Sequence, residues 1–63
     1  MENIGVMIVD DHLVVREGLK QLLEIEDDIE VIAEAAEGKE GLRLLETCSP
    51  DLILMDIGLP GIN

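Results

Sequence analysis

The sequence predicts a small α/β fold in which strands and helices alternate, in the order strand, helix, strand, helix, strand. Short runs rich in apolar residues predict the strands, and the unbroken first run is typical of a strand covered on both faces of a sheet. Apolar residues that recur every three or four positions predict the helices. Because a helix separates each strand from the next, we expect parallel strands and right-handed crossovers. A chain of 63 residues has room for one such unit.

The first strand and the first helix are the most clearly marked elements. Residues 4–9, IGVMIV, form an apolar run that stops at the acidic pair Asp10 and Asp11. Residues from about 13 to 25 have the pattern of an amphipathic helix. Its expected apolar face consists of Val15, Leu19, Leu22 and Leu23. Its expected polar face consists of Arg16, Glu17, Lys20, Gln21 and Glu24.

Weaker signals mark the rest of the chain. After a polar break, residues 29–36 predict a second strand. Residues 39–47 predict a second helix, although Gly41 is an unfavourable residue in a helix interior. This helix should end before Pro50, because the residue that precedes a proline avoids the helical conformation. Residues 52–55, LILM, predict the third strand.

Charge and composition narrow the classes of partner. The 15 acidic and 4 basic residues give a formal net charge of −11, which argues against binding to nucleic acid or to an anionic membrane, since both are polyanions. Cations and basic protein surfaces are the expected partners. The single cysteine, Cys48, cannot form an internal disulfide and is expected to be a small, partly buried residue. With no signal peptide and no apolar run of membrane-spanning length, we expect a cytoplasmic protein.

Two of the predicted strands end in carboxylates. Asp10 and Asp11 follow the first strand, and Asp56 follows the third. In parallel sheets ligands bind beyond the carboxyl ends of the strands, so these residues should meet at one edge. Three like charges there would suit a hard cation such as Mg²⁺, and a carboxylate beside it could form an aspartyl phosphate. The alternative is that Asp10 and Asp11 cap the first helix and Asp56 is an exposed turn residue.

Three stretches of the sequence resemble a known family. They are IVDDH at residues 8–12, VVREGLKQLLE at 14–24 and PDLILMDIGLPG at 50–61. Together they are similar to the amino-terminal half of the receiver domain of bacterial two-component response regulators. The DDH motif followed by VREGL suggests the subfamily whose output domains are helix-turn-helix transcription factors. The resemblance covers essentially all 63 residues.

The resemblance implies a fold and a set of roles. The fold would be half of a flavodoxin-like, doubly wound parallel sheet with strand order 2-1-3 and one helix on each face. Asp56 would be the residue phosphorylated by a sensor histidine kinase, in a signalling module that is not itself an enzyme. The expected Mg²⁺ ligands are Asp10, Asp11, Asp56 and the backbone carbonyl of Gly58. A direct chemical role for His12 is not expected, because a lone histidine at a helix start is usually solvated.

The resemblance also implies parts that this sequence lacks. A complete receiver domain of the family is about twice as long as this sequence. It has a hydroxyl residue after a fourth strand and a lysine after a fifth. We therefore interpret residues 1–63 as a truncated receiver domain without an output domain, phosphorylated inefficiently and unable to signal. The alternative is an engineered or structural half-domain with no activity. A phosphohydrolase with an aspartyl nucleophile is disfavoured, because its first strand would end in Asp-x-Asp.

The predicted third strand raises an expectation about assembly. In the complete fold it lies between two other strands, whereas here its outer edge would be apolar and unpaired. An open structure of 63 residues would also bury little apolar area to offset the entropy of ordering. We therefore expect a homodimer or higher oligomer formed through residues 52–55.

Overall fold

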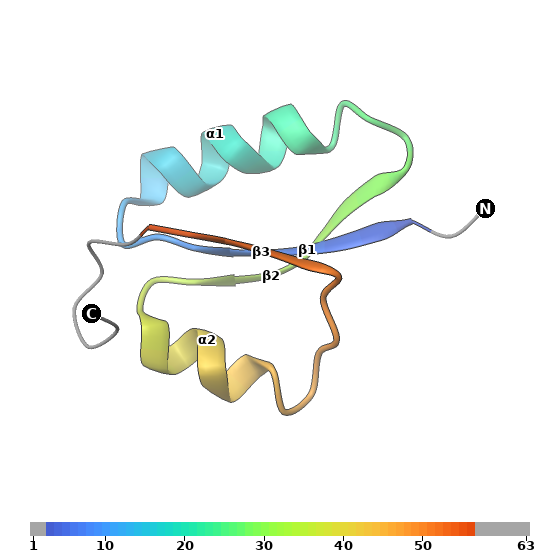
Figure 1. Ribbon diagram of the computed structural model, residues 1–63. Coiled ribbons are helices and arrows are strands. Elements are labelled where there is room, and N and C mark those ends of the chain that lie inside the picture. Colours follow the sequence, from blue (N-terminus) through green and yellow to red (C-terminus); the bar gives the residue numbers. More distant parts are fainter. Residues whose placement is uncertain (1–2, 57–63) are drawn as a thin grey trace.

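The computed structural model describes residues 3–56 and contains the five predicted elements in the predicted order (Figure 1). Their bounds are β1 Ile4–Val9, α1 Leu13–Leu23, β2 Ile29–Ala35, α2 Gly38–Leu44 and β3 Leu52–Met55. The bounds of β1 and β3 match the prediction, and the other elements differ from it by at most three residues, most of all at the end of α2. There the N–H groups of Glu46 and Thr47 donate to the carbonyls of Arg43 and Leu44, three residues back. The last predicted turn is therefore a tighter turn and not α-helix.

The three strands form one parallel sheet in the order β2-β1-β3, which confirms the predicted order. Helix α1 covers one face and α2 covers the other (Figure 1). The β1–β2 pairing contains a bulge after Val6, where Ile32 is the extra residue of β2. Gly5 leaves room for the side chain of Ile32, because a Cβ at residue 5 would lie 3.2 Å from Ile32 Cδ1. The bulge is thus accommodated by the smallest residue of the central strand.

The buried core is centred on β1. Val6, Met7, Ile8 and Val9 are each 1% exposed or less. Met7 and Val9 pack with Ala35 of β2 on the face that α2 covers. Gly41, which made the helix prediction weaker, allows α2 to approach this cluster: a Cβ there would lie 3.1 Å from Val9 Cγ2. The glycine that lowers helix propensity thus permits close packing between helix and sheet.

Helix α1 faces the sheet with a side that was only partly predicted: Leu19 and Leu23 belong to it as expected, whereas the other two predicted residues do not. The half-buried residues are Arg16, Leu19, Lys20 and Leu23, which are spaced as one helical face. Val15 and Leu22, which were assigned to the apolar face, are 43% and 66% exposed. The prediction was wrong for these two residues because the aliphatic stems of arginine and lysine can pack against a sheet while their charged groups reach polar partners.

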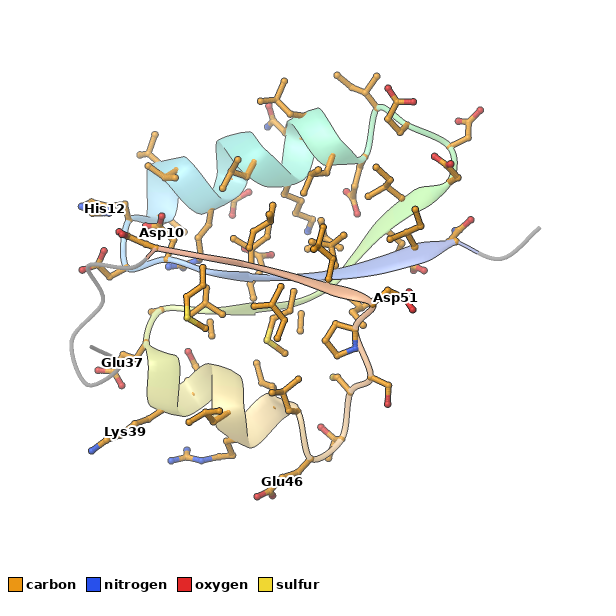
Figure 2. All side chains as sticks on the ribbon, in the orientation of Figure 1. Asp10, His12, Glu37, Lys39, Glu46 and Asp51 are labelled. Carbon is orange, nitrogen blue, oxygen red and sulfur yellow. The ribbon has the colours of Figure 1, made fainter. Side chains whose placement is uncertain are left out.

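Two hydrogen bonds between Asp51, just before β3, and Gly5 fix that strand against β1. The Asp51 N–H donates to the Gly5 carbonyl at 2.8 Å, and the Gly5 N–H donates to Asp51 Oδ2 at 2.8 Å. At the other end of the strand, the Asp56 N–H donates to the Val9 carbonyl at 3.1 Å. In Figure 2, Asp51 and Asp10 lie toward opposite ends of the sheet. This pairing places Asp56 beside the residue that follows β1.

Strand β3 leaves apolar side chains at the surface. Leu52, Ile53 and Met55 are 49%, 37% and 38% exposed. Among the residues that the structure describes, β1 is the only strand that pairs with β3. Within the same part of the chain, no helix is long and apolar enough to cross a membrane.

Candidate functional site

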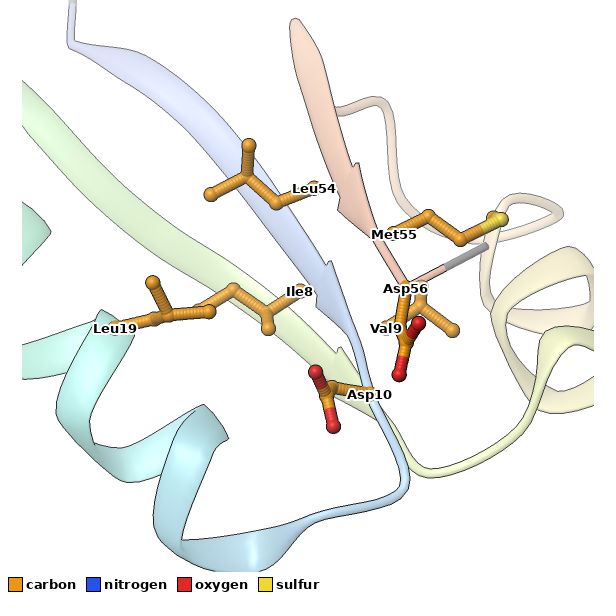
Figure 3. Close-up of a pocket in the computed structure, with 7 residues that line it drawn as sticks. All are labelled: Ile8, Val9, Asp10, Leu19, Leu54, Met55 and Asp56. Carbon is orange, nitrogen blue, oxygen red and sulfur yellow. The ribbon is translucent and has the colours of Figure 1, made fainter. Parts of the chain in front are cut away.

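Four side chains from two ends of the sequence meet at the carboxyl edge of the sheet. Asp10 follows β1, Asp11 and His12 lie in the turn to α1, and Asp56 follows β3. One ligand atom from each of these residues lies within 4.8 Å of the others. The predicted convergence of Asp10, Asp11 and Asp56 is therefore present in the structure. Figure 3 shows the carboxylates of Asp10 and Asp56 at neighbouring strand ends.

Asp10 is the buried member of the cluster, with 9% of its surface exposed. Its N–H donates to the Ala35 carbonyl of β2 at 3.0 Å. Its Oδ1 accepts the His12 N–H at 2.8 Å and lies 2.9 Å from His12 Nδ1. The backbone hydrogen bond from His12, followed by the one from its ring, lowers the pKa of Asp10 below its usual 3.8. Asp10 is therefore a fixed negative charge at neutral pH.

His12 connects the two adjacent acids. Its Nδ1 lies 2.9 Å from Asp10 Oδ1 and 2.9 Å from Asp11 Oδ1, while its side chain is 65% exposed. The hydrogen bond to Asp10, and then the charge of Asp11, raise the pKa of His12 above its usual 6.5. The ring is exposed as predicted, but its pairing with both acids was missed. The only signal in the sequence is that His12 directly follows Asp10 and Asp11.

His12 is also the residue that precedes the first turn of α1. It is the N-cap residue, and its side chain makes no capping hydrogen bond. The alternative in which Asp10 caps the helix is not what the structure shows, because its carboxylate binds the His12 N–H, before the first helical residue. Asp10 and Asp11 are thus held at the sheet edge and not at the helix N–H groups.

Arg16 approaches the site from α1. Its Nη1 donates to the Asp10 backbone carbonyl at 2.7 Å, and its side chain is only 17% exposed. Its Nε lies 3.6 Å from Glu34 Oε1 on β2, and Lys20 Nζ lies 3.7 Å from Glu34 Oε2. Arg16 had been assigned to the polar face of the helix, so its contact with the β1–α1 turn that holds Asp10 and Asp11 (the acidic turn) was missed.

An open pocket lies beside the carboxylates. It has a volume of about 330 Å³ and an apolar lining, with two acids at its edge (Figure 3). It is lined by Ile8, Val9, Asp10, Leu19, Leu54, Met55 and Asp56. A ligand at the acidic edge would thus have both charged oxygens and open space next to it.

The donor set fits a hard divalent cation. Three carboxylates bring oxygen atoms within 4.8 Å of one another, and Mg²⁺ prefers oxygen over nitrogen or sulfur as a ligand. A cation would also offset the repulsion among the three negative charges. The fourth expected ligand, the carbonyl of Gly58, lies outside the residues that the structure describes. The three described carboxylates therefore have the ligand chemistry that the predicted Mg²⁺ site requires.

The fold and the site together define a class of protein: doubly wound α/β units with an acidic centre at the carboxyl edge of the sheet. The chain belongs to the response regulator receiver domain family, which it matches over residues 6–63. This confirms the resemblance drawn from the three sequence stretches.

The relatives are regulators of much greater length. The nitrate/nitrite response regulator protein NarL of Escherichia coli K12 is 45% identical over 62 residues, covering 98% of this chain and 29% of NarL. The transcriptional regulatory protein LiaR of Bacillus subtilis 168 is 52% identical over 60 residues, covering 95% of this chain and 28% of LiaR. The chain thus spans less than a third of the length of these curated relatives.

A solved structure supports the same fold. The two-component response regulator of the LuxR family from Aurantimonas sp. SI85-9A1 superposes with a TM-score of 0.88 and 43% sequence identity. The match covers 95% of this chain and 43% of that one. The flavodoxin-like arrangement with β1 at its centre is therefore shared with a known response regulator.

Proposed function

We propose that this chain is the phosphoacceptor part of a receiver domain in a two-component signalling system. Asp56 would accept a phosphoryl group from a sensor histidine kinase in the cytoplasm, and the parent protein would regulate transcription. One observation carries the proposal: carboxylates that follow two different strands, β1 and β3, come within 4.8 Å of one another. A family of signalling domains that the chain matches over most of its length supports the assignment.

Each acid would have its own task. A carboxylate oxygen of Asp56 would attack the phosphorus of the donor, so that a new O–P bond forms as the donor's P–N bond breaks and the donor nitrogen takes a proton. Asp10, Asp11 and Asp56, with the Gly58 carbonyl, would hold Mg²⁺, which neutralises negative charge on carboxylates and phosphate. The hydrogen bonds from His12, which lower the pKa of Asp10, keep that ligand ionised and hold it in place.

His12 would act as a counter-ion rather than as a ligand. Its raised pKa reflects its contacts with Asp10 and Asp11, so an imidazolium there partly offsets the acidic charge when no cation is bound. A cation would compete with the imidazolium for the same oxygens. Binding of Mg²⁺ should therefore lower the pKa of His12.

Signalling would require more than residues 1–63. The hydroxyl residue and the lysine that the family resemblance places after the fourth and fifth strands are not among these residues. We propose that this chain by itself accepts phosphate inefficiently and does not signal. A non-enzymatic half-domain that only self-associates is the competing proposal.

Titration with Mg²⁺ tests the site directly. We expect the amide NMR signals of Asp10, Asp11 and Asp56 to shift together, and the pKa of His12, the only histidine, to fall at saturating Mg²⁺. Asp11→Asn should weaken Mg²⁺ binding, as measured by either response, about tenfold or more, because it removes a charged ligand. Asp27→Asn, an exposed acid in the α1–β2 loop, is the matched control and should titrate like the original chain. If Mg²⁺ moves none of these signals, the proposed site is wrong.

We also propose that β3 mediates self-association, as its exposed Leu52, Ile53 and Met55 suggest. Two copies could pair their β3 strands around a two-fold axis into one continuous sheet. Sedimentation at micromolar concentration should show a dimer or larger species, and Ile53→Lys should shift it toward monomer by placing a charge at the shared edge. A stable monomer of the unchanged sequence would refute this proposal.

A further inference from the structure

The β1–α1 turn holds two of the proposed metal ligands, and one basic side chain reaches it from inside the fold. The guanidinium of Arg16 donates from Nη1 to the Asp10 carbonyl at 2.7 Å. No other hydrogen bond from a described side chain reaches that carbonyl. The Arg16 side chain is 17% exposed, so the contact is largely shielded from solvent. A shielded hydrogen bond from a charged donor is stronger than an ordinary one.

The Asp10 carbonyl belongs to the peptide unit that joins Asp10 to Asp11. A peptide unit is planar, so fixing its oxygen also fixes the direction in which both residues leave it. The Asp10 N–H is already held by the Ala35 carbonyl at 3.0 Å. Arg16 holds the carbonyl, so both backbone polar groups of Asp10 are fixed. The backbone positions from which the Asp10 and Asp11 side chains extend are therefore fixed as well.

Arg16 is itself anchored to a strand that contributes no ligand. Its Nε is buried and lies 3.6 Å from Glu34 Oε1 of β2, beyond hydrogen-bond distance, and no described residue accepts a hydrogen bond from it. Lys20, one turn further along α1, lies 3.7 Å from Glu34 Oε2. Arg16 and Lys20 thus share one partner, but only Arg16 also contacts the Asp10 carbonyl.

We propose that Arg16 is a positioning residue for the acidic centre: through the Asp10 carbonyl it fixes the two adjacent carboxylates in the arrangement that binds a divalent cation. This inference rests on the proposed Mg²⁺ site. It assigns Arg16 no contact with the cation or with the phosphoryl group.

Two effects of Arg16 on Mg²⁺ oppose each other. Its positive charge repels the cation, whereas its hydrogen bond prepares the ligands. Removal of the side chain therefore raises Mg²⁺ affinity if repulsion dominates and lowers it if positioning dominates. The guanidinium hydrogen bond to the Asp10 carbonyl is direct, short and largely shielded from solvent, whereas Arg16 contacts the cation ligands only through the backbone, so we expect positioning to dominate.

The test compares Mg²⁺ dissociation constants, from amide NMR shifts, among the original chain, Arg16→Gln, Arg16→Lys and Lys20→Gln. We expect Arg16→Gln to weaken binding about tenfold, as loss of a residue that orients a ligand commonly does. Arg16→Lys keeps the charge but not the guanidinium geometry, and we expect an effect of about threefold or more. Lys20→Gln removes the other basic partner of Glu34 and leaves the Asp10 carbonyl contact in place. Its Mg²⁺ affinity should match that of the original chain.

Several results would overturn the inference. One is that folded Arg16→Gln binds Mg²⁺ as tightly as the original chain or more tightly. Another is that Lys20→Gln loses as much Mg²⁺ affinity as Arg16→Gln. If Arg16→Gln does not fold, Arg16→Lys decides, and unchanged binding by that variant counts against the proposal.

A second measurement needs no metal and separates this inference from the proposed function. The His12 N–H donates to Asp10 Oδ1, so its hydrogen exchange reports how firmly that carboxylate is held. We expect exchange to speed up at His12 in the Arg16 variants and not in Lys20→Gln. If the original chain binds no Mg²⁺, the proposed function fails, and this exchange result alone then decides the role of Arg16.

Discussion

Asp56→Asn is expected to abolish phosphorylation of this chain by acetyl phosphate in the presence of Mg²⁺. An asparagine side chain keeps the size of the aspartate but has no anionic oxygen to form the acyl phosphate. For the original chain we expect a minor fraction with the added mass of one phosphoryl group, as measured by intact-protein mass spectrometry. Near-complete conversion would contradict the proposed inefficiency.

The matched control for this experiment is Asp27→Asn, which removes an exposed acid away from the cluster. It should be modified to the same extent as the original chain. Omission of Mg²⁺ should remove the modification from both. If Asp56→Asn still gained the phosphoryl mass, another residue would be the acceptor and the assignment of Asp56 would be wrong.

Ile8→Ala is expected to have the largest effect on stability. Ile8 is 0% exposed at the centre of the sheet, and truncation of a fully buried isoleucine costs about 2–5 kcal/mol. A domain of this size has a total stability of roughly 3–9 kcal/mol, so the variant should lose a large fraction of its stability and unfold at a much lower urea concentration. Urea denaturation followed by circular dichroism measures the loss, at one protein concentration for all variants.

Ile25→Ala provides the comparison for that result. Ile25 lies after α1 and is 72% exposed, so the same chemical change should alter the free energy of unfolding by no more than about 0.5 kcal/mol. A loss below about 1 kcal/mol for Ile8→Ala would show that β1 is not the stabilising centre of the fold.

Most of the fold could be predicted from the sequence because β1 and β3 are continuous apolar runs and β2 is rich in apolar and β-branched residues. The five elements and their order follow from that pattern, and so does the convergence of Asp10, Asp11 and Asp56 at one sheet edge. The strand order required the family resemblance, since apolar runs do not specify which strands are neighbours.

The parts that could not be predicted depend on side chains with two kinds of surface. A periodicity analysis counts Arg16 and Lys20 as polar, yet their aliphatic stems occupy the sheet-facing side of α1. It likewise counts Val15 and Leu22 as core residues, although both are exposed. The contacts of His12 and Arg16 with the acidic turn depend on this rotation of the helix and on turn geometry, which spacing alone does not determine.

The two helices are attached to the sheet by different kinds of interaction. On one face, α2 packs through Gly41 and Leu44 against buried apolar groups. On the other, α1 combines the half-buried Leu19 and Leu23 with Arg16 and Lys20, whose charged ends reach Glu34. Apolar contacts weaken on cooling, whereas ion pairs weaken as salt rises. Cooling should therefore weaken the apolar contacts on both faces, whereas rising salt should act mainly on the α1 face, which supports the turn that holds Asp10 and Asp11.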